Sequence, residues 1–201
     1  SLAGRGVENL SLVTPTHQTY AIDAAFCLLK EQGQLPCVPI VWNSSGYDTV
    51  ETIRFMSRWV SVWLPDLKFF DPLLSAALAG APDYFTHASA AIRAMAEEAG
   101  QAAYSANGLM ARGLLIRHLV LPGHTRDSIR LLEWVASEFG SSVPVSLMSQ
   151  YTPMPEASGA PERHVTRREY DRVLSALFRL GLEDGYVQER GAAGMEQIPV
   201  W

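Results

Sequence analysis

The sequence of 201 residues predicts an α/β protein built around a largely parallel β-sheet. Short apolar runs rich in β-branched and aromatic residues alternate with longer segments of helical periodicity, which is typical of βα units. Most of these runs are continuously hydrophobic, as expected for parallel strands that are covered on both faces. The length suits one well-packed domain that spans residues 1–201.

Six apolar runs are predicted to be the strands, and each is bounded by turn-forming or polar residues. The two cysteines, Cys27 in the helical segment AAFCLL and Cys37 at the start of the second run, are expected to be core thiols. In chain order the runs are Asn9–Val13, Cys37–Trp42, Val60–Leu64, Leu114–Leu121, Val143–Met148 and a shorter one at Tyr186–Gln188.

Helices are predicted where apolar residues recur every three or four positions and end at a glycine. Gln18–Gln32 has such a face, and Gly33 is placed to end it in a left-handed conformation. Pro82 starts an alanine-rich helix that ends near Gly100, and a later helix stops at Gly140.

Capping residues mark the starts of three helices. Asp48 with Glu51, and Thr166 with Glu169, have the spacing of a capping box ahead of an apolar pattern. Asp127 favours the positive N-terminal end of the helix that stops at Gly140.

The last part of the chain begins with a loop. Tyr151–Val165 contains three prolines and one glycine, which predicts a long surface loop within the domain. A C-terminal helix and a closing strand and tail are expected over residues 166–201.

Composition excludes several classes of protein. Hydrophobic residues make up 48% of the chain and charged residues 18%, which excludes a disordered chain. A net charge of −5 argues against a nucleic-acid partner bound through a broad basic surface. No apolar stretch approaches the roughly 20 residues that span a bilayer, so no membrane partner is expected. Two scattered cysteines favour a reducing, cytoplasmic location.

Polar residues able to bind or react follow the predicted strands, at the edge where parallel α/β sheets hold their ligands. Asp66 and Lys68 in LPDLKFFD are two residues apart, so in extended geometry both side chains point to the same side. They could bind a zwitterionic ligand or form an ion pair that closes the end of the sheet. Arg117 interrupts the apolar run LLIRHLVLPG, which favours an inward, ligand-facing arginine. His118 is predicted to point to the opposite face, packed under a helix.

Several segments resemble the radical S-adenosylmethionine (SAM) proteins related to pyruvate formate-lyase activating enzyme. The resemblance covers essentially the whole chain in unbroken order. It is carried by NLSLVTPTH, VWNSSGYDTVET, LPDLKFFD, APDYF, GLLIRHLVLPGHTRDS and SLMSQYTPM, with EYDRVL and GYVQE near the end. It implies a partial, open (β/α) TIM-type barrel that binds SAM and carries a 4Fe-4S cluster on three cysteines of a CxxxCxxC loop.

The resemblance also implies roles for the flagged residues. VTPTH falls where the wider family has a Gly-Gly-Glu-Pro turn for the methionine amino group, so its last four residues are candidates by position. Asn43 takes the place of an acidic residue, Asp66 and Lys68 match an Asp-Leu-Lys that contacts the methionine moiety, and Arg117 matches an arginine near the cofactor. Gln150 belongs to the region that lines the adenosine end. The cofactor-binding set is Thr14, Pro15, Thr16, His17, Asn43, Asp66, Lys68, Arg117 and Gln150.

The sequence contains no three-cysteine cluster motif, and two scattered thiols cannot replace one. The chain is therefore expected to be a fragment that lacks the first strand and the cluster loop of a longer parent, and to be inactive by itself. Asn9–Val13 is then an exposed edge strand, at which self-association is expected.

The expected function is the SAM-binding portion of an activase that places a glycyl radical on a partner protein, or of a maturase that acts on a peptide. The parent enzyme would need an electron donor. Two alternatives stay open: a barrel lyase or aldolase that uses Lys68 as a Schiff-base amine, and a non-catalytic binding domain.

Overall fold

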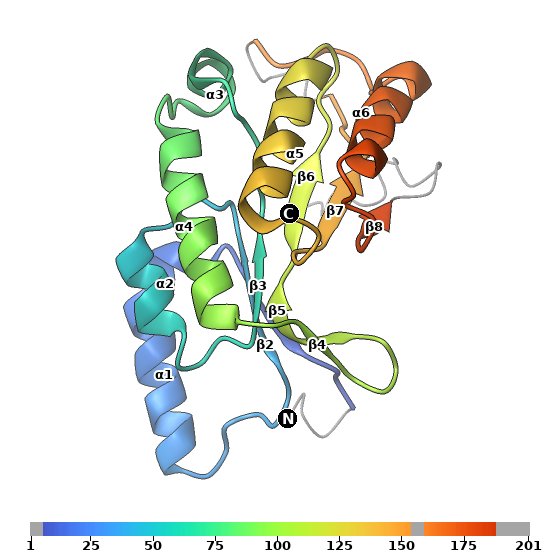
Figure 1. Ribbon diagram of the computed structural model, residues 1–201. Coiled ribbons are helices and arrows are strands. Elements are labelled where there is room, and N and C mark those ends of the chain that lie inside the picture. Colours follow the sequence, from blue (N-terminus) through green and yellow to red (C-terminus); the bar gives the residue numbers. More distant parts are fainter. Residues whose placement is uncertain (1–5, 154–158, 188–201) are drawn as a thin grey trace. The chain divides into compact units, whose positions relative to one another are not determined.

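The computed structural model describes residues 6–153 and 159–187, which form two compact units (Figure 1). Unit 1 contains the described residues up to Asp66 together with Thr86–Leu115. Unit 2 contains Leu67–Phe85 and the described residues from Ile116 onward. Gln188 of the last predicted strand, part of the predicted loop and the predicted tail lie outside the described residues, and the single domain over 1–201 stays a prediction.

The sheet of unit 1 has the strand order β1-β2-β3-β5-β4. Its first four strands in that order are parallel, as the continuous apolar runs predict, and β4 joins β5 in an antiparallel pair. β1 lies at the edge, where the sequence predicts an edge strand; self-association there stays a prediction. The strands are β1 (Leu10–Val13), β2 (Ile40–Ser44), β3 (Val62–Pro65), β4 (Ala103–Tyr104) and β5 (Met110–Leu114).

Helices α1 (Thr19–Glu31), α2 (Val50–Met56) and α4 (Tyr84–Ala99) lie along one side of this sheet (Figure 1). A short 3-10 helix, η2 (Pro15–Gln18), precedes α1. Gly33 follows α1 with φ of 65°, which confirms its predicted left-handed conformation. α4 begins in unit 2 and continues into unit 1.

The two faces of the unit 1 sheet differ in burial. Trp42 of β2 pairs in register with Trp63 of β3, and their side chains are 0% and 1% exposed. Asn43 and its register partner Leu64 alternate with them and are only half-buried. Val41 and Val62 of the Asn43 face are buried, so this face is accessible only toward the carboxyl ends of the strands.

Unit 2 contains a second, three-stranded parallel sheet with the order β6-β7-β8. Its core is formed by fully buried apolar side chains from the sheet and the helices, including Ile116, Leu147, Leu131 and Leu177. The elements are α3 (Pro72–Ala79), β6 (Ile116–Leu119), α5 (Thr125–Phe139), β7 (Val145–Met148), α6 (Arg167–Arg179) and β8 (Tyr186–Val187).

The predicted strand Leu114–Leu121 is wrong as a single element, because the chain changes hydrogen-bond partners at Leu115. The Leu115 N–H donates to Trp63 in unit 1, whereas the Ile116 N–H donates to Pro144 in unit 2. Apolar residues on both sides of the break hide it in the sequence. The prediction of two core thiols is also wrong, because Cys37 is exposed before β2 and Cys27 of α1 is only half-buried.

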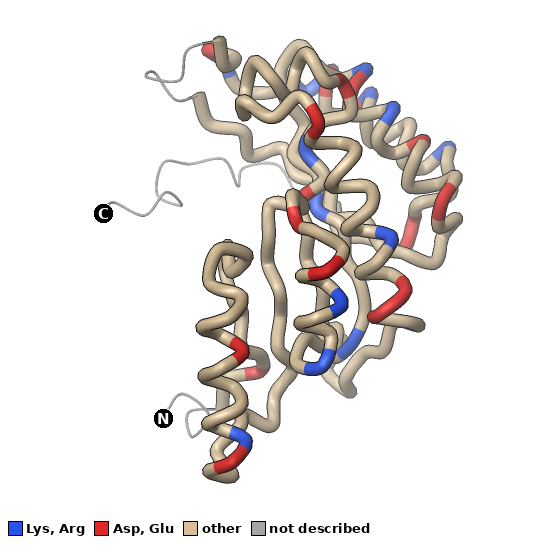
Figure 2. Tube along the Cα trace, turned by 90° about the vertical axis from the view of Figure 1, so that its left-hand side faces the viewer, with Lys and Arg blue, Asp and Glu red and all other residues tan. Residues whose placement is uncertain are grey.

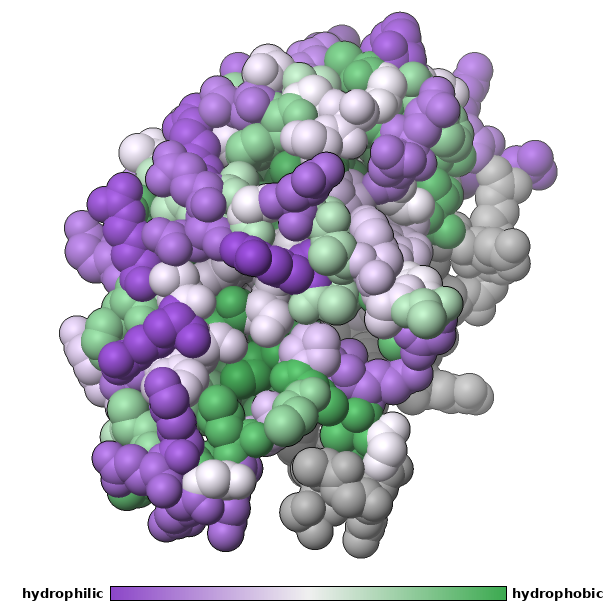
Figure 3. Space-filling model, turned by 60° about the horizontal axis from the view of Figure 1, so that its bottom comes forward, coloured by the Kyte–Doolittle hydropathy of each residue, from purple (hydrophilic) through white to green (hydrophobic). Residues whose placement is uncertain are grey.

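Charged residues of both signs are interspersed along the helices (Figure 2). Hydrophilic and apolar side chains are likewise mixed on the face shown in Figure 3. The exposed apolar residues include Tyr104 and Leu109 of the β4–β5 hairpin. Among the described helices, none combines the length and the apolar character that a membrane span requires.

Glu169 connects three parts of unit 2. The predicted capping box is confirmed, since Thr166 and Glu169 exchange side-chain to backbone hydrogen bonds at the start of α6. The same carboxylate accepts the Gly123 N–H at 2.7 Å and two guanidinium N–H groups of Arg163 at 2.7 Å. The Arg163 guanidinium, with Thr166 and Gly123, holds the pKa of Glu169 well below its ordinary range.

The substitution Glu169→Gln is expected to lower the free energy of unfolding by about 1–3 kcal/mol at neutral pH, because charge-assisted hydrogen bonds are lost. A carboxyl whose pKa is lowered on folding stabilises the fold above its unfolded pKa, and this contribution falls as the pH drops below the ordinary value of 4.5. Urea unfolding at about pH 7 and about pH 3 should therefore show a larger acid loss for the wild type than for the variant. Glu183→Gln, at an exposed position, is the control; an equal acid loss in the wild type and Glu169→Gln would contradict the prediction.

Candidate functional site

Asn43 and Asp66 come together at the carboxyl ends of the unit 1 strands. Asn43 pairs in register with Val13 and Leu64, and Asp66 follows Leu64 by two residues. The Asp66 N–H donates to the Ser44 carbonyl at 2.9 Å, so the chain stays beside β2 after β3 ends. Both side chains are half-buried. They provide an amide and a carboxylate on the accessible face of the sheet.

The VTPTH turn lies at the same edge. The Thr14 N–H donates to the Asn43 carbonyl at 2.8 Å, and Thr14 itself has a left-handed backbone with φ of 49°. This conformation is uncommon for a β-branched residue and persists where surrounding contacts enforce it. Pro15 is buried, and the exposed His17 lines a cavity of about 390 Å³ beside the starts of α1 and α2.

The side chain of Asp48 helps to hold the VTPTH turn in place. Its carboxylate is 2% exposed and accepts hydrogen bonds from the hydroxyls of Thr16 at 2.6 Å and Ser44 at 2.5 Å. The Ser44 hydroxyl in turn accepts the Gly46 N–H at 3.2 Å. Asp48 thus joins the loop after β1 to the loop after β2.

The predicted helix-capping role of Asp48 is wrong. Thr49 is the N-cap of α2, and its hydroxyl accepts the Thr52 N–H at 3.2 Å. Asp48 precedes the cap by one residue, and two hydroxyls already occupy its carboxylate. Either residue fits the sequence pattern for a cap, and only the fold shows that Thr16 is close to Asp48.

Lys68, Arg117 and Gln150 belong to unit 2. Arg117 pairs with Ser146, and Gln150 follows Met148 of the same strand by two residues, so Arg117 and Gln150 occupy the same face of the sheet. The Leu67 N–H donates to the Arg117 carbonyl at 2.8 Å, which places Lys68 beside β6. The Lys68 N–H donates to the Tyr84 hydroxyl at 3.0 Å. Tyr84 thus holds the backbone of Lys68, a role that the sequence pattern does not indicate.

His118 alternates with Arg117 along β6 and lies on the opposite, buried face, as the strand pattern predicts. Its side chain is 2% exposed, and its Nδ1 lies 2.6 Å from the Leu67 carbonyl oxygen. The structure therefore gives His118 a structural contact with the segment that carries Lys68.

Comparison with known proteins adds one curated relative and several solved structures. No protein-family model matches the chain. An uncharacterized protein of Methanocaldococcus jannaschii, MJ0674, is 26% identical over 151 residues, which cover 73% of this chain. The chain spans 40% of the length of that relative.

Three solved structures resemble the chain over most of its length. A domain of pyruvate-formate lyase-activating enzyme from Bacteroides vulgatus has a TM-score of 0.60 at 15% identity, covering 90% of this chain and 98% of that one. Streptococcus suis SuiB has a TM-score of 0.59 at 13% identity, covering 93% of this chain and 40% of that one. HydG, a maturase of the [FeFe]-hydrogenase, has a TM-score of 0.53 at 12% identity, covering 92% of this chain and 42% of that one. The chain has the radical SAM fold.

The radical SAM fold confirms the predicted class, an α/β chain with mostly parallel strands of a partial, open TIM-type barrel. The predicted cofactor-binding residues that belong to unit 1 are Thr14, Pro15, Thr16, His17, Asn43 and Asp66. Lys68, Arg117 and Gln150 belong to unit 2. That the two sets share one ligand stays a prediction.

The residues present do not fit the 4Fe-4S cluster that the radical SAM fold implies. Within residues 6–153 and 159–187 there is no group of three or more His, Cys, Asp and Glu side chains that could hold a metal ion. Cys27 is half-buried on α1, Cys37 is exposed before β2, and both are free thiols. Cluster ligation requires clustered thiolates, so no step is assigned through a cluster in this chain.

Taken separately, each unit offers one half of the chemistry that the methionine end of SAM requires. A zwitterionic amino acid requires acceptors for its ammonium group and cations for its carboxylate. Unit 1 provides the acceptors Asn43 and Asp66, and unit 2 provides the cations Lys68 and Arg117. Partial burial strengthens such contacts relative to those at a fully exposed surface.

Proposed function

We propose that this chain is the SAM-binding portion of a radical SAM iron-sulfur enzyme of the activating-enzyme type. The observation that carries the proposal is the register of β2 and β3, which brings Asn43 and Asp66 to one accessible face at the strand ends. The radical SAM fold supports the proposal because ligands of parallel α/β sheets bind at that edge.

Each proposed role follows from the chemistry of the side chain. Asp66 and Asn43 accept hydrogen bonds from the ammonium group of the cofactor, and backbone groups of the Thr14–Thr16 turn add to them. Lys68 and Arg117 bind its carboxylate, with Arg117 able to do so through two parallel N–H groups. Gln150 offers an amide to the adenosine end. Radical chemistry in this class uses a reduced 4Fe-4S cluster, so the proposed work of these residues is to bind and orient SAM.

A protein or peptide is the proposed substrate of the enzyme. SuiB, which shares the fold at a TM-score of 0.61, has been solved bound to its precursor peptide SuiA. By the resemblance to activating enzymes, we propose a glycyl radical enzyme as the partner, with an electron donor for the cluster. A cytoplasmic location is also proposed, because both cysteines are free thiols.

Calorimetric titration of the 201-residue chain with SAM tests the proposal. We expect saturable binding that Asp66→Asn and Arg117→Gln each weaken by about tenfold, because one charge-assisted contact contributes roughly 1.5–3 kcal/mol. Asp184→Asn and Arg179→Gln make the same charge changes at exposed positions outside the site and should leave the affinity unchanged.

Two results would contradict this function. The first is the absence of SAM binding by a chain whose circular dichroism and melting curve show that it is folded. The second is covalent labelling of Lys68 by an aldehyde and borohydride, which would favour a Schiff-base lyase or aldolase instead.

A further inference from the structure

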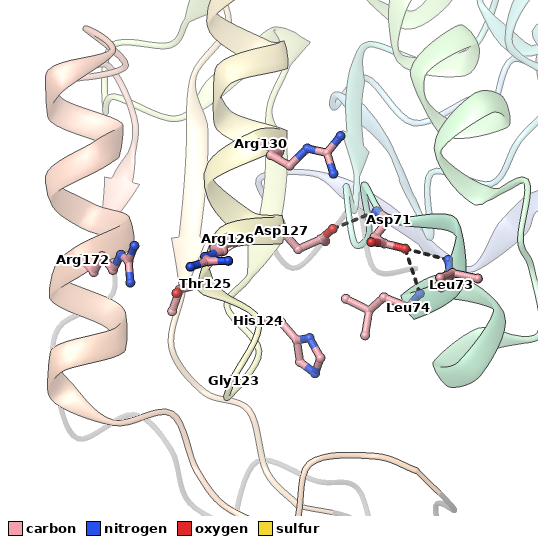
Figure 4. Close-up of a pocket in the computed structure, with 10 residues that line it drawn as sticks. All are labelled: Asp71, Leu73, Leu74, Gly123, His124, Thr125, Arg126, Asp127, Arg130 and Arg172. Atoms are coloured by element: carbon pink, nitrogen blue, oxygen red, sulfur yellow. Dashed lines mark hydrogen bonds between the residues drawn. The ribbon is translucent and has the colours of Figure 1, made fainter.

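A cavity of about 750 Å³ lies in unit 2, and its lining residues include none of those assigned to SAM (Figure 4). It is lined by α3, by the start of α5 and by α6. Arg126 and Arg130 of α5 and Arg172 of α6 contribute three guanidinium groups, and His124 lies at the start of α5. In Figure 4, Arg126 and Arg172 extend toward each other from their two helices, and Arg130 lies one turn farther along α5. None of these residues takes part in the proposed cofactor site.

The three guanidinium groups of this cavity outnumber the two carboxylates that line it, so a net positive charge remains. Over residues 6–153 and 159–187, no ion pair joins Arg126, Arg130 or Arg172 to a carboxylate. Arg130 instead stacks over the Phe70 ring, with its guanidinium carbon 4.0 Å from the ring centroid. All three arginines are exposed to solvent at the cavity wall.

The two carboxylates that line the cavity are occupied by backbone amides. Asp127 is buried and accepts the N–H groups of Phe70 at 3.0 Å and Asp71 at 2.8 Å. Asp71 caps α3 and accepts the N–H groups of Leu73 at 2.7 Å and Leu74 at 3.3 Å. Because these bonds fix both carboxylates at the loop and helix start, the guanidinium groups remain available to an external anion.

The first turn of α3 adds two apolar side chains to the cavity wall. Leu73 and Leu74 of the first turn of α3 line it, and Leu73 is 80% exposed. A largely exposed leucine in the same cavity as three arginines offers an apolar contact in addition to the cationic ones. The volume and the distribution of arginines over two helices exceed what one phosphate or one carboxylate would use.

We propose that this cavity docks an acidic, leucine-containing segment of a partner protein. Carboxylates of the segment pair with Arg126, Arg130 and Arg172, and an apolar side chain of the segment packs on Leu73. Charge complementarity selects this partner. The whole chain has a net charge of −5, but the three arginines make this cavity locally positive, so it attracts an acidic segment. The inference does not depend on the proposed SAM site, since the two sets of residues are distinct.

Fluorescence anisotropy of the full chain tests the proposal with a short fluorescein-labelled peptide in which Asp and Glu alternate with Leu. We expect binding that weakens by about tenfold in the triple variant Arg126→Gln, Arg130→Gln, Arg172→Gln, because three exposed charge pairs are lost. A matched triple variant, Arg54→Gln, Arg168→Gln, Arg179→Gln, removes the same charge from exposed positions outside the cavity and should bind as the wild type does. Leu73→Ser should weaken binding further without changing the melting temperature.

Three results would overturn the proposal. One is the absence of binding to the wild-type chain at low ionic strength. Another is an equal loss of affinity in both triple variants, which would show an effect of net charge alone. The third is equal competition by inorganic phosphate or by an acidic peptide without leucine, which would show a small-anion site. Failure of SAM titration would leave these outcomes unaffected, so the two proposals are tested separately.

Discussion

The substitution Asp48→Ala is expected to lower the free energy of unfolding by about 2–4 kcal/mol, because it removes the buried acceptor of two hydroxyl groups. Thr16 and Ser44 would each keep a hydroxyl donor without its present partner, and Ser44 is almost fully buried. Urea or guanidinium unfolding of the variant against the wild type measures the difference.

A graded series separates this loss from a general effect of the loop. Asp48→Asn keeps one acceptor oxygen and should lose less stability than Asp48→Ala. Ser44→Ala removes one of the two hydroxyl groups that donate to Asp48. It should lower the free energy of unfolding by about 1 kcal/mol. Thr49→Ala removes the true N-cap of α2, which costs about 1 kcal/mol. If Asp48→Ala cost no more than Thr49→Ala, the buried network would not be what holds the two loops together.

The second large effect is expected at Trp42, where Trp42→Ala should cost about 3–5 kcal/mol. The side chain is completely buried and contacts Trp63 with a ring-centroid distance of 6.2 Å. Alanine would leave a cavity at the centre of the unit 1 core. Thermal and denaturant unfolding followed by circular dichroism would measure the loss.

Trp42→Phe provides the control for this substitution. In the part of the chain that the structure describes, the Trp42 Nε1 has no hydrogen-bond partner. Phenylalanine removes this buried donor while it keeps an aromatic ring, so the cost should be well below that of alanine. Equal destabilisation by Trp42→Phe and Trp42→Ala would contradict this prediction.

Much of the fold could be predicted from the order of apolar runs. β1, β2, β3 and β7 lie within or close to their predicted runs, because each is a short buried strand between clear turn residues. The break at Leu115 could not be predicted, since residues on both sides of it are apolar and the change of partner depends on long-range contacts with Trp63 and Pro144. The short α3 was missed because its alanines and leucines carry little periodic pattern.

The candidate site was predictable in part. Arg117 stands out in an apolar run, and Asp66 and Lys68 stand out at a strand end, so elementary desolvation arguments single them out. Asp48 and Tyr84 could not be found in this way, because their partners are 32 residues away at Thr16 and 16 residues away at Lys68. Their chemistry becomes visible only when the fold brings these segments together.

The left-handed Thr14 has a consequence for the way such chains are recognised. The turn it belongs to is held by hydrogen bonds from Thr16 to Asp48 and from Thr14 to Asn43, and no glycine lies among residues 13–17 to mark it. A search by letter pattern for a glycine-rich turn passes over such a sequence. A search by backbone dihedral signature and by the strand-end amide and carboxylate would retrieve it, and would group it with proteins that share its geometry.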